Sequence, residues 1–70
     1  MTKIEATKRI KAQASERGRP IRRITWHYFN PLTTASGRRA KVGALTIESD
    51  GHNPLRLAFQ WTESEGWRLF

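Results

Sequence analysis

The pattern of this sequence changes at residues 18–20, and that change constrains the fold more than any other feature. Before it, apolar residues recur with the spacing of a helix, and after it they alternate with polar residues as in a strand. Gly18 suits the end of a helix, and Pro20 prevents its continuation because proline lacks a backbone N–H. The sequence therefore predicts one helical segment followed by a segment made of strands.

The helix is predicted over residues 2–17. Thr2 and Glu5 have the spacing of a capping box, in which side chains satisfy the free backbone donors of the first turn. The apolar stripe is thin, because only Ala6, Ile10 and Ala14 follow one another a turn apart. Such a helix buries one narrow face and exposes cations on the rest.

The sequence after the helix, from residue 21 onward, predicts an antiparallel sheet. Strands are expected at about 21–29, 39–49, 55–61 and 67–70, with a loop at 30–37 and a tight turn at the Asp-Gly pair of residues 50–51. The fold class is therefore α+β, with an N-terminal helix packed on a three- to four-stranded antiparallel β-meander. This order of elements is similar to the front part of double-stranded-RNA-binding domains and, with a further strand, to Sm-like barrels. The motif residues of neither family are present, so the resemblance implies no site.

Alternation assigns the side chains of the sheet to two faces. The predicted core consists of Ile10, Ile24, Trp26, Tyr28, Leu45, Ile47, Leu57, Phe59, Trp61, Trp67 and Leu69. The opposite face is expected to carry Arg23, Thr25, His27, Thr46, Arg56, Gln60 and Arg68. His27, Phe29 and Phe70 should also project from that face, where they are candidates for stacking on unpaired bases, although Phe29 and Phe70 could instead pack at an edge or in a homodimer interface.

Charge is distributed unevenly along the chain. Residues 1–41 contain eleven Lys and Arg against two Glu, whereas residues 42–70 contain two Arg against four acidic residues. The net charge of +7 favours polyanionic partners, and nucleic acid is the most abundant of these in cells. The sequence predicts a small basic module, without enzymatic activity, that binds the phosphate backbone of DNA or RNA.

The candidate phosphate-binding residues are the cations of the N-terminal half. Guanidinium groups bind phosphate oxygens with two parallel hydrogen bonds, and hydroxyls such as those of Thr33, Thr34 and Ser36 often assist. The candidates are Lys8, Arg9, Lys11, Arg19, Arg22, Arg23, Arg38, Arg39 and Lys41. If the first two strands pair, Arg22 and Arg23 should lie at the opposite end of the sheet from Arg38 and Arg39.

Two other functions fit the same sequence. The chain could be a protein-interaction module or inhibitor, of the kind that mobile elements make, that docks on an acidic surface of a larger host complex. A small ribonuclease, with His27 as general base and an Arg that stabilises the developing charge, is the third hypothesis, although a lone histidine in a strand is rarely catalytic. We expect no catalytic residues, no metal site and no cofactor, since no Cys and only two His are present.

The setting predicted for the chain is the cytoplasm. The absence of Cys suits a reducing compartment, and no apolar run reaches the length of a membrane span. Either a monomer or a homodimer is compatible with so short a chain.

Overall fold

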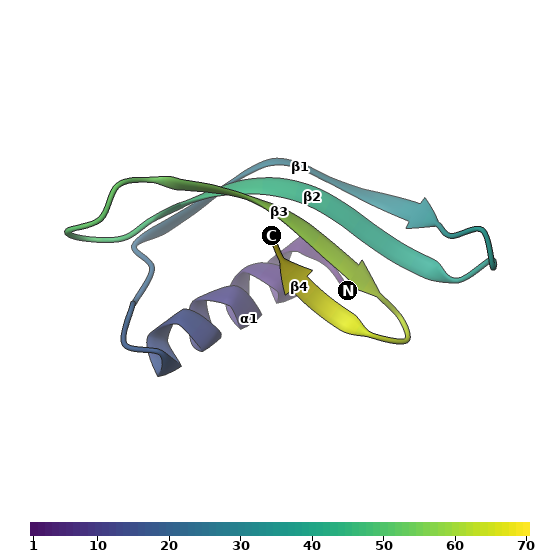
Figure 1. The fold of residues 1–70 in the computed structure, drawn as a ribbon, viewed down its shortest axis with the longest axis horizontal. Helices are drawn as coiled ribbons and strands as arrows, with labels where there is room; N and C mark the ends of the chain where they lie inside the picture. Colours follow the sequence, from purple (N-terminus) through teal and green to yellow (C-terminus); the bar gives the residue numbers. More distant parts are fainter.

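The computed structural model describes residues 1–70 and consists of one helix followed by four strands (Figure 1). The elements are α1 (Lys3–Glu16), β1 (Arg23–Thr33), β2 (Arg39–Glu48), β3 (Leu55–Thr62) and β4 (Gly66–Leu69). The strands form one antiparallel sheet in the order β1-β2-β3-β4, which is open and not closed into a barrel. The predicted α+β fold, a helix on a β-meander, is confirmed.

Both ends of α1 form as the sequence indicates. The Thr2 hydroxyl accepts a hydrogen bond from the Glu5 backbone N–H at 3.2 Å, so Thr2 is the N-cap. Gly18 follows the C-cap with a positive φ of 77°, a conformation that glycine adopts without steric cost. The helix therefore has defined ends although little of its surface is apolar.

The core lies between α1 and one face of the sheet, which we call the helix-facing side. Ala6 and Ile10 of α1 are buried against Leu45 of β2 and Phe59 of β3. The Trp26 indole N–H donates a hydrogen bond of 2.9 Å to the Thr7 hydroxyl, which joins β1 to the helix. The opposite side of the sheet is covered by no element, as Figure 1 shows, and we call it the open face.

A β-bulge at His27 changes the alternation within β1. Trp26 lies opposite Leu45 and Tyr28 lies opposite Ala44, so two steps on β1 match one step on β2. Beyond this point the side chains exchange faces relative to a regular strand. Phe29 packs against Trp26 and Phe59, with ring centroids 5.1 and 5.6 Å away, whereas Tyr28 is 48% exposed. The predictions that Tyr28 lies in the core and that Phe29 projects from the other face are therefore wrong.

The first strand is also longer than its sequence pattern indicates. β1 continues to Thr33 through Asn30 and Pro31, where the sequence predicts a loop. Proline is tolerated there because β1 is an edge strand, so its missing N–H disrupts pairing on one side at most. The turn that joins β1 to β2 is accordingly short, at residues 34–38.

Candidate functional site

Most cations of this protein have no acidic partner. Only Arg22, Arg23 and Arg68 have a carboxylate oxygen within 4.0 Å, and the other ten Lys and Arg side chains have none. The predicted helical candidates Lys8, Arg9 and Lys11 are among these ten, and all three are exposed on α1. Since the helix occupies the other side of the sheet, these three cations lie away from the open face.

Arg22 and Arg23 lie at the end of the sheet where β1 begins. The register places Arg23 opposite Glu48, and the distance from Arg23 Nε to a Glu48 oxygen is 3.7 Å. Arg22 Nε lies 3.2 Å from the Asp50 carboxylate. The acidic residues of the second half of the chain thus offset two candidate arginines of the first half. The sequence carried a signal for this pairing, because antiparallel strands joined by a short turn bring residues 22–23 beside residues 48–50.

Arg38 and Arg39 lie at the other end of the sheet, at the β1–β2 turn. Both are exposed and unpaired. The turn is held by its own hydrogen bonds: the Thr34 hydroxyl accepts from the Arg38 backbone N–H at 3.1 Å and lies 3.1 Å from the Ser36 hydroxyl. These hydrogen bonds order the turn, and Arg38 and Arg39 are the cationic side chains that it exposes.

The two arginine pairs are well separated, as predicted. The strand from Arg23 to Thr33 spans roughly 30 Å at the usual rise per residue, and the longest dimension of the molecule is 42 Å. Lys41 is half-buried on β2 opposite Pro31 and Trp61, and Arg19 is exposed in the segment between α1 and β1. The nine predicted cations therefore form no single cluster, and are spread over both ends of the sheet and the helix.

The open face contains the predicted polar residues together with two aromatic side chains. His27 contacts Thr46, with Nε2 2.7 Å from the hydroxyl, and Arg56 lies opposite Thr46 on the neighbouring strand. Phe70 is 61% exposed, and its backbone pairs with Ala58 through two hydrogen bonds. Tyr28 is the aromatic residue that alternation missed. The only signal for it was the run of residues 26–29, four consecutive aromatic rings that a regular strand cannot place on one face.

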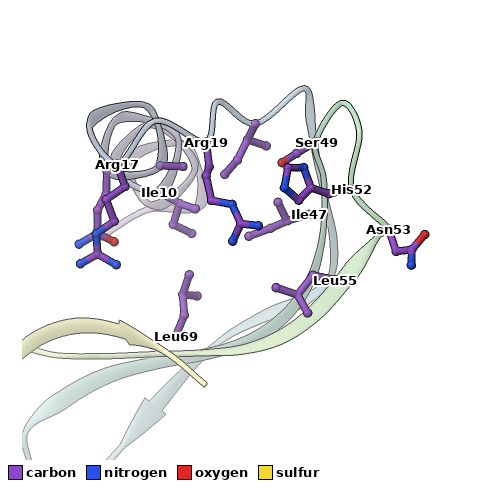
Figure 2. Close-up of a pocket in the computed structure, with 12 residues that line it drawn as sticks. Ile10, Arg17, Arg19, Ile47, Ser49, His52, Asn53, Leu55 and Leu69 are labelled. Atoms are coloured by element: carbon purple, nitrogen blue, oxygen red, sulfur yellow. The ribbon is translucent and has the colours of Figure 1, made fainter.

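A pocket of about 400 Å³ lies between the C-terminal part of α1 and the turn that joins the end of β2 to the beginning of β3 (Figure 2). Apolar side chains line much of it, including Ile10, Ile47 and Leu55. Arg19 extends over the space between Ile10 and Ile47, and Arg17 lies at the helix side (Figure 2). The pocket thus combines an apolar floor with two unpaired guanidinium groups.

The two histidines lie in different parts of the molecule and have different hydrogen-bond partners. His27 contacts Thr46, and His52 Nδ1 lies 3.1 Å from the backbone oxygen of Asp50. No three His, Asp or Glu side chains gather in a way that would hold a metal ion. The single helix is too short and too polar to cross a bilayer.

No protein-family model, curated protein or solved structure matches this chain.

Proposed function

We propose that this chain is a nucleic-acid-binding protein that holds phosphate groups through its unpaired lysine and arginine side chains. The observation that supports this function is the excess of cations without partners: ten side chains of thirteen. A surface ion pair stabilises a fold by about 1 kcal/mol or less, so these ten cations contribute little as structural groups. Their combined field instead attracts a polyanion.

The arginines at the β1–β2 turn are the candidates best supported for direct contact. Arg38 and Arg39 are adjacent, exposed and carried on a turn that its own hydrogen bonds order. Arg22 and Arg23, by contrast, already face Glu48 and Asp50. Removal of either arginine pair lowers the net charge by two, so the two double variants form a matched comparison.

Fluorescence anisotropy tests this function. Labelled duplex DNA, single-stranded DNA and RNA are titrated with protein freed of carried-over nucleic acid, at about 50 and about 200 mM salt. The slope of log affinity against log salt should fall in magnitude for Arg38→Ala/Arg39→Ala by about 0.7 to 0.9 for each phosphate that the variant no longer neutralises. We expect a clearly smaller change for Arg22→Ala/Arg23→Ala.

Two results would argue against this assignment. If the wild-type protein binds none of the three nucleic acids at the lower salt concentration, the proposed function is wrong. If both double variants lose affinity equally, binding follows net charge and Arg38 and Arg39 are not a contact site.

Docking on an acidic protein surface is the second candidate function, and the pocket beside Arg17 and Arg19 is the observation that favours it. An apolar side chain next to a carboxylate on a partner protein would match its floor and its two cations. Competition separates the two functions, because a nucleic-acid-binding protein keeps its affinity for purified DNA or RNA of ordinary sequence. Leu55→Asp, at the pocket, should abolish binding to a protein partner and leave nucleic-acid binding unchanged.

A further inference from the structure

The centre of the open face is apolar, although nothing covers it. Strand register places Tyr28, Ala44 and Ala58 side by side across β1, β2 and β3, and Phe70 pairs with Ala58 at the end of the row. Two exposed aromatic rings therefore stand at the two ends of a row whose middle positions are alanines. Three strand spacings separate them by roughly 14 Å.

Polar and cationic side chains lie on both sides of this aromatic row. On one side are Arg56 and the bonded pair of His27 and Thr46. On the other side, Asn30, Val42, Gln60 and Arg68 form the next row across the sheet. The Arg68 guanidinium lies 5.9 Å from the centre of the Phe70 ring. Exposed aromatics are thus flanked by cations and hydrogen-bonding side chains.

Few carboxylates approach this surface. Glu48 lies at its far end opposite Arg23, and Glu65 in the β3–β4 turn pairs with Arg68 at 2.7 Å. Both Arg68 and Glu65 are more than half exposed, so water weakens that pair. The rows that contain Tyr28 and Arg56 include no acidic residue. The charge on the face therefore complements an anion.

We propose that the open face binds single-stranded nucleic acid, with unpaired bases stacked on Tyr28 and Phe70 and a phosphate held by Arg56, which has no acidic partner. This proposal rests on the proposed nucleic-acid-binding function and names its substrate class. Stacking on a side-chain ring requires that the face of a base be accessible, which pairing within a duplex prevents. An exposed sheet surface with aromatic residues among cations meets that requirement.

A second copy of the chain fits this face less well. Packing of the open face on its copy would place Arg56 and Arg68 of both copies in one interface that contains few acidic side chains to pair them. Like charges brought together in an interface cost several kcal/mol. The central alanines also leave a shallow floor between the rings, which suits a flat base.

Tyr28→Ala is the primary test variant, because its side chain is half exposed and lies outside the core. Its affinity for a labelled oligothymidylate should fall roughly five- to hundredfold, the usual effect of losing one stacked base. Phe70→Ala should show a loss in the same range, and Tyr28→Phe should retain wild-type affinity. Leu32→Ala is the matched control, since Leu32 is an exposed apolar residue on the same face without an aromatic ring. Circular dichroism establishes that each variant is folded.

The results separate this proposal from the function on which it rests. If the protein binds nucleic acid but Tyr28→Ala, Phe70→Ala and Leu32→Ala all retain wild-type affinity for oligothymidylate, the stacking site is wrong and the broader function stands. If no nucleic acid binds at all, both fail. A further arm uses poly-glutamate as competitor: if it displaces oligothymidylate at equal charge concentration, the face recognises acidic polymers, including acidic proteins, by charge alone, and the proposal is overturned.

Discussion

Gly43 of β2 lies beside the bulged strand with no room for a side chain. A Cβ atom at this position would lie 2.7 Å from the Tyr28 backbone oxygen and 3.1 Å from the Trp26 ring. The Trp26 indole lies on the helix-facing side, packed against the core that Leu45 and Phe59 form, and its ring occupies the space beside Gly43. A backbone atom cannot move aside as a flexible side chain can, so a larger residue must displace β1.

We expect Gly43→Ala to lower the free energy of unfolding by about 1–3 kcal/mol, the usual cost of overpacking. Denaturant unfolding measures the loss, and near-ultraviolet circular dichroism should show a changed tryptophan environment. Ala44→Gly is the control: it alters the adjacent residue, on the open face, and should leave the tryptophan signal unchanged. An unaltered unfolding midpoint in Gly43→Ala would contradict the close approach seen at this residue.

At the scale of the elements, the sequence predicted the order and type of the segments, with three to four strands expected, but not which residues of β1 face the helix beyond the bulge. The end of the helix followed from Gly18 and Pro20, and the extent of β3 followed from its period-two pattern, whereas β1 continues to Thr33 through the predicted loop. The predicted faces of Tyr28 and Phe29 were wrong because strict alternation was applied through residues 26–29, where the run of four aromatic rings was the only sign of a bulge. The prediction of the open face was correct for Thr46 and Arg56, which lie on strands without a bulge, and for Phe70, which follows β4 and pairs with Ala58. The ion pairs of Arg22 and Arg23 were missed because the charges were counted along the chain, whereas the pairing follows from the antiparallel register of the first two strands.

The bulge leads to a prediction about a deletion. His27 is the extra residue of β1, so its removal leaves Trp26 facing the helix, Tyr28 facing outward and Phe29 facing the helix in regular alternation. We therefore expect the His27 deletion to remain folded, with a decrease in stability of about 1 kcal/mol because the hydrogen bond to Thr46 is removed. Thermal unfolding, monitored by circular dichroism, measures this decrease in stability.

The matching control is deletion of Thr25, which forces Ile24 or Trp26 onto the open face. That variant should lose most of its cooperative unfolding transition. If the two deletions are equally damaging, the bulge is not a single-residue insertion in an otherwise regular strand.

At the scale of the whole molecule, the net charge of +7 acts on stability as well as on binding. Ten unpaired cations lie on a body of 42 × 22 × 19 Å, so many of them are within a few tens of ångströms of one another. Their mutual repulsion opposes the compact state. Added salt shortens the range of this repulsion to about 8 Å at physiological ionic strength.

We accordingly expect the melting temperature to rise when sodium chloride is increased from a few millimolar to about 150 mM, where screening is substantial. Arg38→Ala/Arg39→Ala should show a smaller rise, since it carries two fewer charges. Differential scanning fluorimetry is sufficient for both proteins. A melting temperature that falls with added chloride would mean that attractive pairs such as Arg22 with Asp50 outweigh the repulsion.

The strand order β1-β2-β3-β4 has a consequence for how the chain acquires its structure. Every strand pairs with the one that precedes it, so the sheet can grow as successive hairpins without closing a long loop. Proteins dominated by such local contacts fold faster than those whose strands must find distant partners. The helix is synthesised first, but its buried partners Leu45 and Phe59 belong to β2 and β3, so the surface on which it packs is complete only when both hairpins have formed. Collapse onto α1 is therefore expected to be the late step in folding, following sheet formation.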